Sequence, residues 1–232
     1  EGSLELKEIL RIGSQIASGL AAAHAHGLVH RDIKPANILL ENGVERVKIT
    51  DFGLARAVDD VNITRTGVIA GTPQYMSPEQ AEGHVIDHRS DLFALGSVLY
   101  AMCTGRAAFR ADNPMAVMRR VCDDQPRDIQ EINADVPDWL CAIIERLLAK
   151  DASERFQTAA EVSELLAQWL AHVQQPALIP APVGIGRQPV SRAAKKVSTR
   201  QRPTVRKGQA GSPSPRLRWP LITAVALGLL LP

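Results

Sequence analysis

The sequence predicts a mainly α-helical domain with a small β patch near its start, an α+β arrangement in which helices dominate. Apolar residues recur at three- and four-residue steps in five segments, a spacing typical of amphipathic helices. Short runs of branched apolar residues between residues 28 and 49 indicate strands, because turn-forming residues separate them. With about 170 residues, the domain is long enough to bury one hydrophobic core.

The first part of the chain is expected to contain one helix and three short strands. The helix covers residues 4–26 and ends at Gly27, because glycine often follows the last turn of a helix. Residues 52–78 hold many turn formers and few apolar runs, which predicts a long loop, and loops of this length are usually functional. The expected strands are Leu28–Val29, Ile38–Leu40 and Val47–Ile49.

Four more helices are expected after residue 90. Asn113 and Pro114 form a typical helix start, since asparagine caps the N-terminus and proline fits the first turn. Thr158 and Glu161 have the spacing of a capping box. Together with the apolar stripes, these signals predict helices from Asp91 to Gly105, from Pro114 to about Cys122, across Trp139–Leu148 and from Thr158 to about Leu170.

The composition excludes several protein classes. An apolar fraction of 45% and a charged fraction of 22% are ordinary for a globular protein, which excludes a fully disordered or collagen-like chain. Three cysteines are too few for a disulfide-stapled miniprotein or a four-cysteine zinc site. They are expected to be core thiols of a protein in a reducing compartment: Cys103, Cys122 and Cys141. Four histidines lack metal-ligand spacing and are expected to be polar or capping residues: His24, His26, His84 and His88.

The net charge of +2 averages two unlike parts of the chain. Residues 1–172 contain 17 Lys and Arg and all 25 Asp and Glu, a net charge of −8. Residues 173–232 contain the other 10 basic residues and no acidic ones, so the chain divides into an acidic body and a basic tail. Seven prolines fall within residues 173–218 without helical periodicity, which predicts a flexible, disordered linker there.

Residues 219–232 are expected to begin a membrane-spanning helix that is cut off by the end of this sequence. As a helix, the apolar run Leu221–Leu231 would span roughly 16 Å, about half of the ~30 Å hydrocarbon layer of a membrane. Arg216, Arg218 and Trp219 precede it; cations at this place favour the cytoplasmic side, and tryptophan suits the membrane interface. A natural chain with a short apolar C-terminus is the alternative.

Two acidic motifs lie at the edges of the expected β patch. Residues 30–37 read HRDIKPAN and residues 51–53 read DFG, with Asp51 following Asp32 by 19 residues. In this order and spacing they resemble the catalytic loop and the metal-binding loop of the protein kinase superfamily. Residues 71–79 read GTPQYMSPE and resemble the end of a kinase activation segment, with SPE in place of the more usual APE.

The resemblance implies a phosphoryl-transfer site, where positioning and charge neutralisation supply most of the catalysis. Asp32 would accept or orient the proton of the attacking hydroxyl, and Lys34 would contact the transferred phosphate of ATP. Asn37 and Asp51 would hold Mg²⁺, with Mn²⁺ as the other suitable ion, because both ions prefer hard oxygen ligands. Lysine at position 34 resembles the Ser/Thr kinases rather than the tyrosine kinases.

Further residues match supporting positions of the family. Asp91 resembles the aspartate that braces the backbone of the catalytic loop. Glu79 and Arg155 resemble the buried ion pair that ties the activation segment to the late helices, and loss of one partner would cost on the order of 3–5 kcal/mol. The remaining motif residues are expected to act structurally: His30 and Phe52 by packing, Gly53 by its backbone freedom, and Thr72 by a hydroxyl at the substrate site.

Regulation by phosphorylation is expected in the loop between the DFG motif and the segment 71–79. Arg31, next to the catalytic Asp, is in this family the usual partner of a phosphate on the activation loop. Thr64 and Thr66 lie in that loop, and phosphate there would add about −1.5 to −2 charges and order the loop through Arg31. We therefore expect autophosphorylation at both threonines, with a second copy of the kinase as the partner.

The resemblance covers residues 1–172 and begins at the first long helix of the C-terminal lobe. The Gly-rich loop of the family, its strand lysine and the glutamate that pairs with it have no counterpart here, so the N-terminal lobe is absent from this chain. We expect the parent protein to phosphorylate Ser and Thr of protein substrates with ATP, and this fragment alone to be inactive.

The order of kinase body, basic linker and single span resembles the bacterial receptor-type Ser/Thr kinases. It implies a single-pass signalling protein with its kinase body in the cytosol, at the cytoplasmic face of the cell membrane.

One alternative is a pseudokinase or scaffold, against which the intact motif residues argue. Another is a nucleic-acid or anionic-lipid binding arm formed by the tail. The tail's cations would attract nucleic acid only through charge, because no aromatic residues alternate with them to stack on bases.

Overall fold

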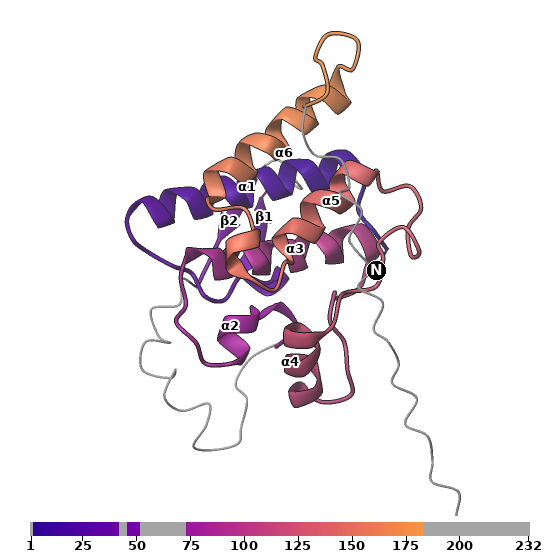
Figure 1. The fold of residues 1–232 in the computed structure, drawn as a ribbon. Coiled ribbons are helices and arrows are strands. Elements are labelled where there is room, and N and C mark those ends of the chain that lie inside the picture. Colours follow the sequence, from indigo (N-terminus) through magenta and orange to yellow (C-terminus); the bar gives the residue numbers. More distant parts are fainter. Residues whose placement is uncertain (1, 42–45, 52–72, 183–232) are drawn as a thin grey trace, which may run out of the picture. The chain divides into compact units, whose positions relative to one another are not determined.

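The computed structural model describes residues 2–41, 46–51 and 73–182 (Figure 1). The chain divides into two units, residues 1–190 and 191–232, and the second unit lies outside the described residues. The expected membrane segment belongs to that second unit. Among the residues that are described, no helix is both long enough and apolar enough to cross a membrane.

Helices dominate the described residues, as the sequence predicts, and one pair of strands follows the first helix. In the described part of the chain, three short 3₁₀ turns connect the elements: Pro35–Asn37, Pro73–Tyr75 and Ala152–Glu154. The helices and strands are, in chain order, α1 (Leu6–Ala25), β1 (Ile38–Glu41), β2 (Arg46–Ile49), α2 (Pro78–Ala81), α3 (His88–Thr104), α4 (Pro114–Asp123), α5 (Asp138–Leu147) and α6 (Ala159–Gln174).

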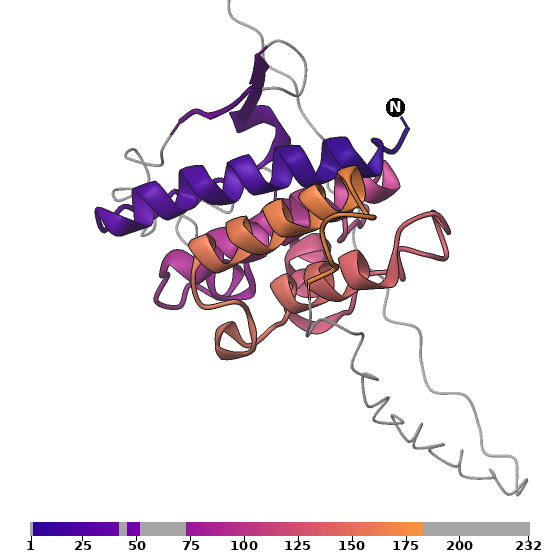
Figure 2. The same cartoon turned by 90° about the horizontal axis from the view of Figure 1, so that it is seen from above.

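Helix α3 forms the centre of the hydrophobic core, and its neighbours approach it closely. A Cβ atom at Gly96 of α3 would lie 2.7 Å from the Cβ atom of Leu147 on α5. A Cβ atom at Gly13 of α1 would lie 2.8 Å from Cδ2 of Leu99 on α3. Both glycines therefore permit helix contacts that a larger residue would push apart. Helix α6 runs alongside α1 (Figures 1 and 2).

The two strands form an antiparallel pair with Ile38 opposite Ile49 and Leu40 opposite Val47. The pair packs on α1, where the backbone N–H of Val47 donates to the side chain of Gln15 at 3.0 Å. In Figure 2, α1 lies between this pair and α6. The strand pair thus places the start of β1 and the end of β2, which carry the two acidic motifs, on one side of α1.

The expected strand at Leu28–Val29 is wrong. The backbone N–H of Leu28 instead bonds back to the carbonyl of Ala23 at 3.1 Å, after the chain turns at Gly27 with a φ of 72°. The backbone N–H groups of the next two residues, His30 and Arg31, bind the side chain of Asp91 on α3, so these groups need no partner strand.

The helix starts predicted from capping residues are confirmed at α4 and α6. The side chain of Asn113 accepts the N–H of Ala116 at 2.9 Å, and Thr158 accepts the N–H of Glu161 at 3.1 Å. The reciprocal half of the predicted capping box is missing, because Glu161 accepts from Gln157 instead. Helix α3 begins three residues earlier than predicted, since Asp87 caps it, and the predicted loop 52–78 ends at α2, whose first residue is Pro78.

Candidate active site

The segment that carries HRDIKPAN runs from the end of α1 to β1, and a buried aspartate of α3 holds its backbone. Oδ1 of Asp91 accepts the N–H of Arg31 and Oδ2 accepts the N–H of His30, both at 2.8 Å. The Asp91 side chain is 0% exposed. Arg31 has a φ of 66°, which is uncommon for a residue with a side chain. The two hydrogen bonds from Asp91 hold the backbone at this strained turn.

His24, at the end of α1, joins the same cluster. Its Nε2 atom lies 2.8 Å from Oδ2 of Asp91, and its side chain is 10% exposed. Its Nδ1 atom is buried and, among the described residues, has no hydrogen-bond partner. The sequence predicts only a polar or capping role for His24, because its partner lies 67 residues away and no local pattern reveals the contact.

The carboxylate of Asp32 lies between a cation and an amide. Nζ of Lys34 lies 2.7 Å from Oδ2 of Asp32, and Nδ2 of Asn37 donates to the same oxygen at 3.1 Å and to the Asp32 carbonyl at 2.8 Å. The side chains of Asp32 and Lys34 are 27% and 21% exposed. Asp32 is therefore oriented by two neighbours and still reachable from solvent, as a group that accepts a hydrogen bond from a substrate hydroxyl must be.

Hydrogen bonds through Thr50 bring Asp51 to this segment. The N–H of Thr50 donates to the carbonyl of Asn37 at 2.9 Å, and the Nε2 atom of His30 lies 2.9 Å from the Thr50 carbonyl. Asp51 follows directly, exposed and with a φ of 56°. Phe52, Gly53, Thr64, Thr66 and Thr72 lie outside the described residues.

Asn37 and Asp51 fit the role of magnesium ligands. Because the amide nitrogen of Asn37 binds Asp32, its carbonyl oxygen is the end of the side chain that can act as a ligand. The carboxylate of Asp51 is exposed, and the strained backbone at this residue is typical of a functional site. Amide and carboxylate oxygens are the ligands that Mg²⁺ prefers in proteins.

A second ionic contact joins Glu79, at the end of the 71–79 segment, to Arg155 in the connection between α5 and α6. Nη1 and Nη2 of Arg155 each bind one carboxylate oxygen of Glu79 at 2.8 Å. Burial by itself would raise the pKa of Glu79, but hydrogen bonds from Arg155 and Ser90 outweigh it, so the pKa lies below its ordinary value. The Arg155 side chain is 0% exposed and also donates to backbone carbonyls of Arg89, Ala149 and Lys150.

Gln80 is a further residue of this region that the motifs do not reveal. Its Nε2 atom donates to the carbonyl of Arg31 at 2.8 Å, across 49 residues of sequence. Its Oε1 atom accepts the N–H of Ser77, the residue that caps α2. Gln80 therefore connects the end of the 71–79 segment to the strained turn that Asp91 holds from the other side.

The comparisons with known proteins agree with this arrangement. Residues 1–170 match the family described as protein kinase domain. Serine/threonine-protein kinase PknB of Mycolicibacterium smegmatis is 40% identical over 164 residues, which are 70% of this chain and 26% of that protein. Probable serine/threonine-protein kinase CPE1738 of Clostridium perfringens is 40% identical over 163 residues, 70% of this chain and 24% of that protein.

Serine/threonine-protein kinase PknB of Mycobacterium tuberculosis is 38% identical over 164 residues, with 70% of this chain and 26% of that protein covered. The chain thus spans about a quarter of the length of the curated relatives it matches. The family match covers most of the acidic body and contains both acidic motifs. The chain therefore belongs to the protein kinase family.

Proposed function

We propose that this chain is the C-terminal lobe of a serine/threonine protein kinase, which transfers the γ-phosphate of ATP to Ser or Thr hydroxyls of proteins. The observation that carries the proposal is the joint contact of Lys34 and Asn37 with the carboxylate of Asp32. The names of the relatives support the choice of Ser and Thr over Tyr as acceptors.

In the proposed reaction, Asp32 accepts a hydrogen bond from the substrate hydroxyl and orients its oxygen toward the phosphate. Lys34, bound to the same carboxylate, places a positive charge where the transferred group becomes more negative. Asn37 and Asp51 would hold Mg²⁺, which neutralises charge on the phosphates of bound ATP. The backbone contacts of Asp91 keep these side chains in one geometry before substrate arrives.

The surface of β1 supports the assignment to one lobe. Leu39 and Leu40 are adjacent strand residues with side chains 50% and 45% exposed. Adjacent strand residues point to opposite faces, and a further domain would cover the apolar surface on the face of Leu39. The sequence also contains no Gly-rich phosphate loop and no VAIK-like strand. On this proposal the chain alone transfers little or no phosphate.

The same proposal includes regulation and location. Phosphate on Thr64 and Thr66, added by a second copy, would bind near Arg31 and order the activation loop. The basic linker and the apolar run Leu221–Leu231 would hold the kinase body at the cytoplasmic face of the membrane. Mass spectrometry of the active full-length protein tests the first point, with neither threonine modified as the contrary result. Deletion of residues 221–231 tests the second, because it should release the protein from the membrane fraction.

The proposed activity is tested by autophosphorylation of the full-length protein with γ-labelled ATP and Mg²⁺. We expect acid hydrolysis to release labelled phosphothreonine or phosphoserine, and Asp51→Asn to abolish labelling. Asp123→Asn is the matched control, because Asp123 is an acidic residue of α4 with a side chain 63% exposed. Absence of label in the wild-type protein would favour the pseudokinase, and label on tyrosine would contradict the substrate class.

A further inference from the structure

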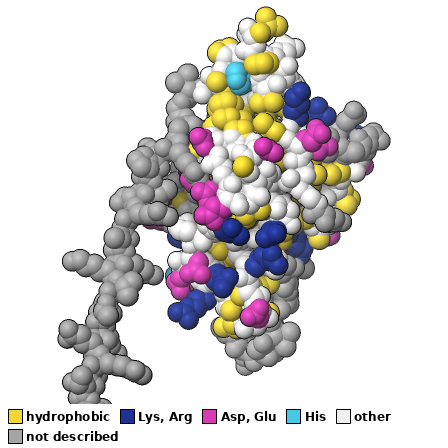
Figure 3. All heavy atoms as spheres, turned by 90° about the vertical axis from the view of Figure 1, so that its right-hand side faces the viewer, with side chains coloured by type: hydrophobic (Ala, Val, Ile, Leu, Met, Phe, Trp, Pro, Cys, Tyr) yellow, Lys and Arg dark blue, Asp and Glu magenta, His cyan; other side chains and the backbone are white. Residues whose placement is uncertain are grey.

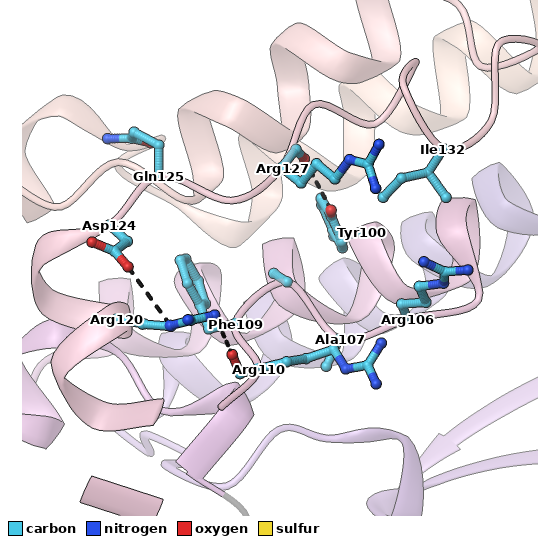
Figure 4. A pocket seen from close by; sticks show the side chains of 11 residues that line it. Tyr100, Arg106, Ala107, Phe109, Arg110, Arg120, Asp124, Gln125, Arg127 and Ile132 are labelled. Atoms are coloured by element: carbon cyan, nitrogen blue, oxygen red, sulfur yellow. Dashed lines mark hydrogen bonds and ion pairs between the residues drawn. The ribbon is translucent and has the colours of Figure 1, made fainter. Parts of the chain in front are cut away.

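An arginine-lined pocket of about 360 Å³ opens where α3 ends, beside α4 and the segment that follows α4 (Figure 4). Its volume is at the lower end of the range of small-ligand sites. The buried ring of Phe109 and the ring of Tyr100 form its apolar part. Four arginines from three different segments line the rest: Arg106, Arg110, Arg120 and Arg127.

Hydrogen bonds fix the backbone that carries these arginines. The hydroxyl of Tyr100 donates to the carbonyl of Arg127 at 2.9 Å, and Nη1 of Arg120 donates to the carbonyl of Arg110 at 2.5 Å. Phe109 is 2% exposed and stacks on Phe93 with 6.0 Å between ring centroids. The cations thus extend from anchored segments, which lowers the entropy lost when a ligand orders them.

The lining of the pocket holds four arginines against a single carboxylate among the described residues. Arg106 and Arg110 form no ion pair within the described ranges of the chain. Arg127 pairs through Nε with Glu131 at 2.9 Å, and Arg120 approaches Asp124 only at 3.8 Å. Asp124 is the one acidic side chain that lines the pocket in the described residues.

Such a cluster favours a phosphate group as ligand. Like charges in one pocket repel each other, and an anion between them removes this cost. The planar guanidinium group also binds two phosphate oxygens at once, which an ammonium group does not do. In Figure 4 the guanidinium groups of Arg106, Arg110 and Arg127 lie on one side of the pocket, while Arg120 crosses the other side toward Asp124.

A larger cavity adjoins this pocket and is lined in part by the HRDIKPAN segment. It has a volume of about 690 Å³, shares Arg106 and Ala107 with the arginine-lined pocket, and is also lined by Pro35 and Tyr75. Pro35 directly follows Lys34, which contacts Asp32. Its lining is largely apolar, with Ile12, Ile38, Leu40, Val98 and Met102 among the residues.

We infer that the arginine-lined pocket binds a phosphorylated Ser or Thr of the protein substrate, at a distance from the acceptor hydroxyl, while apolar residues between the two occupy the larger cavity. The inference rests on the proposed function, since Asp32 marks the place of the acceptor. A polypeptide can fill both cavities at once, whereas a free phosphate or a lipid headgroup would use only the arginines. The kinase would therefore prefer substrates that already carry one phosphate.

Binding of peptides to the full 232-residue chain tests the site without any need for catalysis. The probes are a fluorescein-labelled peptide with one phosphothreonine next to an apolar stretch, and the same peptide with threonine. Fluorescence anisotropy should show that the phosphopeptide binds at least about tenfold more tightly, and that salt weakens the difference. Equal affinity of the two peptides would overturn the inference.

Arg106→Gln/Arg110→Gln should remove the preference, and both residues are exposed, so folding should survive. The matched control is Arg46→Gln/Arg119→Gln, which removes the same charge from side chains 71% and 85% exposed outside the pocket. A pocket variant that keeps the preference, or a control that loses it, would refute the site. Binding to phosphatidylserine vesicles is measured for the same proteins. If the wild-type chain binds the vesicles and the pocket variant does not, while the wild-type chain binds both peptides equally, the pocket is a lipid site and the inference is refuted as well.

A kinase assay with the full-length protein separates failure of the site from failure of the proposed function. If the protein phosphorylates peptides, the pocket variant should raise KM for the phosphorylated peptide and leave kcat and the reaction with the unphosphorylated peptide unchanged. An unchanged KM would contradict the site alone. If the protein phosphorylates nothing while the peptide preference persists, the proposed function fails and the binding site remains.

Discussion

The buried side chain of Asp91 binds the backbone N–H of His30 at 2.8 Å, across 61 residues of sequence. The same carboxylate binds the N–H of Arg31, where φ is 66°, and lies 2.8 Å from Nε2 of His24. The central helix of the core, α3, thus holds the start of the HRDIKPAN segment. A change at Asp91 should affect both stability and catalysis.

Asp91→Ala is expected to destabilise the chain by several kcal/mol. The substitution removes the partner of the buried N–H of His30 and of the part-buried N–H of Arg31, and a buried group left unpaired costs about 1–3 kcal/mol. Urea unfolding followed by circular dichroism measures the change, with the exposed Asp123→Asn as control. A loss below about 1 kcal/mol would show that the backbone of His30 and Arg31 finds other partners.

The pair of Glu79 and Arg155 should behave as a coupled unit. Arg155→Ala removes the two hydrogen bonds that Arg155 donates to the Glu79 carboxylate, and removal of one partner of a buried pair typically costs about 3–5 kcal/mol. In a double-mutant cycle, Glu79→Ala/Arg155→Ala should cost clearly less than the sum of the single changes. Additive losses would mean that the two side chains stabilise the fold independently.

The contribution of Lys150 should depend on pH. Burial lowers the pKa of Lys150 to about 8, while an unfolded lysine titrates near 10.4. Between these values the unfolded chain binds more protons at this residue than the folded one, so stability rises with pH. The free energy of unfolding, relative to Lys150→Met, should therefore increase for the wild-type chain between about pH 7 and pH 9.5. Lys48→Met, at a side chain 49% exposed, is the control, and a pH-independent difference would contradict the prediction.

The two close helix contacts should respond differently to an added methyl group. At Gly96 the new Cβ would lie 2.7 Å from Cβ of Leu147, an atom that cannot move without its backbone. At Gly13 it would meet Cδ2 of Leu99, the end of a side chain that can rotate. Alanine favours the helix by roughly 0.5–1 kcal/mol at both positions. Gly96→Ala should still cost about 1–3 kcal/mol, and Gly13→Ala less, because the side chain of Leu99 can rotate away. Thermal unfolding of both variants measures this order, and a larger loss at Gly13 would reverse it.

The helices and the strand pair could be predicted because their signals are local. Apolar spacing and capping residues such as Asn113 and Thr158 act within a few residues, and the structure has the helices they predict. Leu28–Val29 was wrongly predicted as a strand, because its apolar residues carry no sign that Asp91 holds the backbone that follows. The contacts of His24 and Gln80 were not predicted for the same reason, since they join residues 67 and 49 positions apart.

Within the site, the motifs predict which residues meet but not how they meet. HRDIKPAN places Asp32, Lys34 and Asn37 close in sequence, and their grouping follows from that. The hydrogen bond between Thr50 and Asn37, which brings Asp51 to them, depends on the register of β1 and β2. The arginine-lined pocket depends on three segments that only the packed helices bring together, so composition and spacing do not reveal it.

The central claim is that Asp32 positions the acceptor hydroxyl in a serine/threonine kinase, and phosphate transfer by the full-length protein tests it most directly. The measurement is the initial rate of label transfer from γ-labelled ATP to a Ser/Thr protein substrate for wild type, Asp32→Asn and the control Asp123→Asn. We predict that Asp32→Asn lowers kcat about 10²- to 10⁴-fold, while the control keeps the wild-type rate and the 232-residue chain alone shows no transfer. A full rate for Asp32→Asn, or full activity of this chain by itself, would contradict the account.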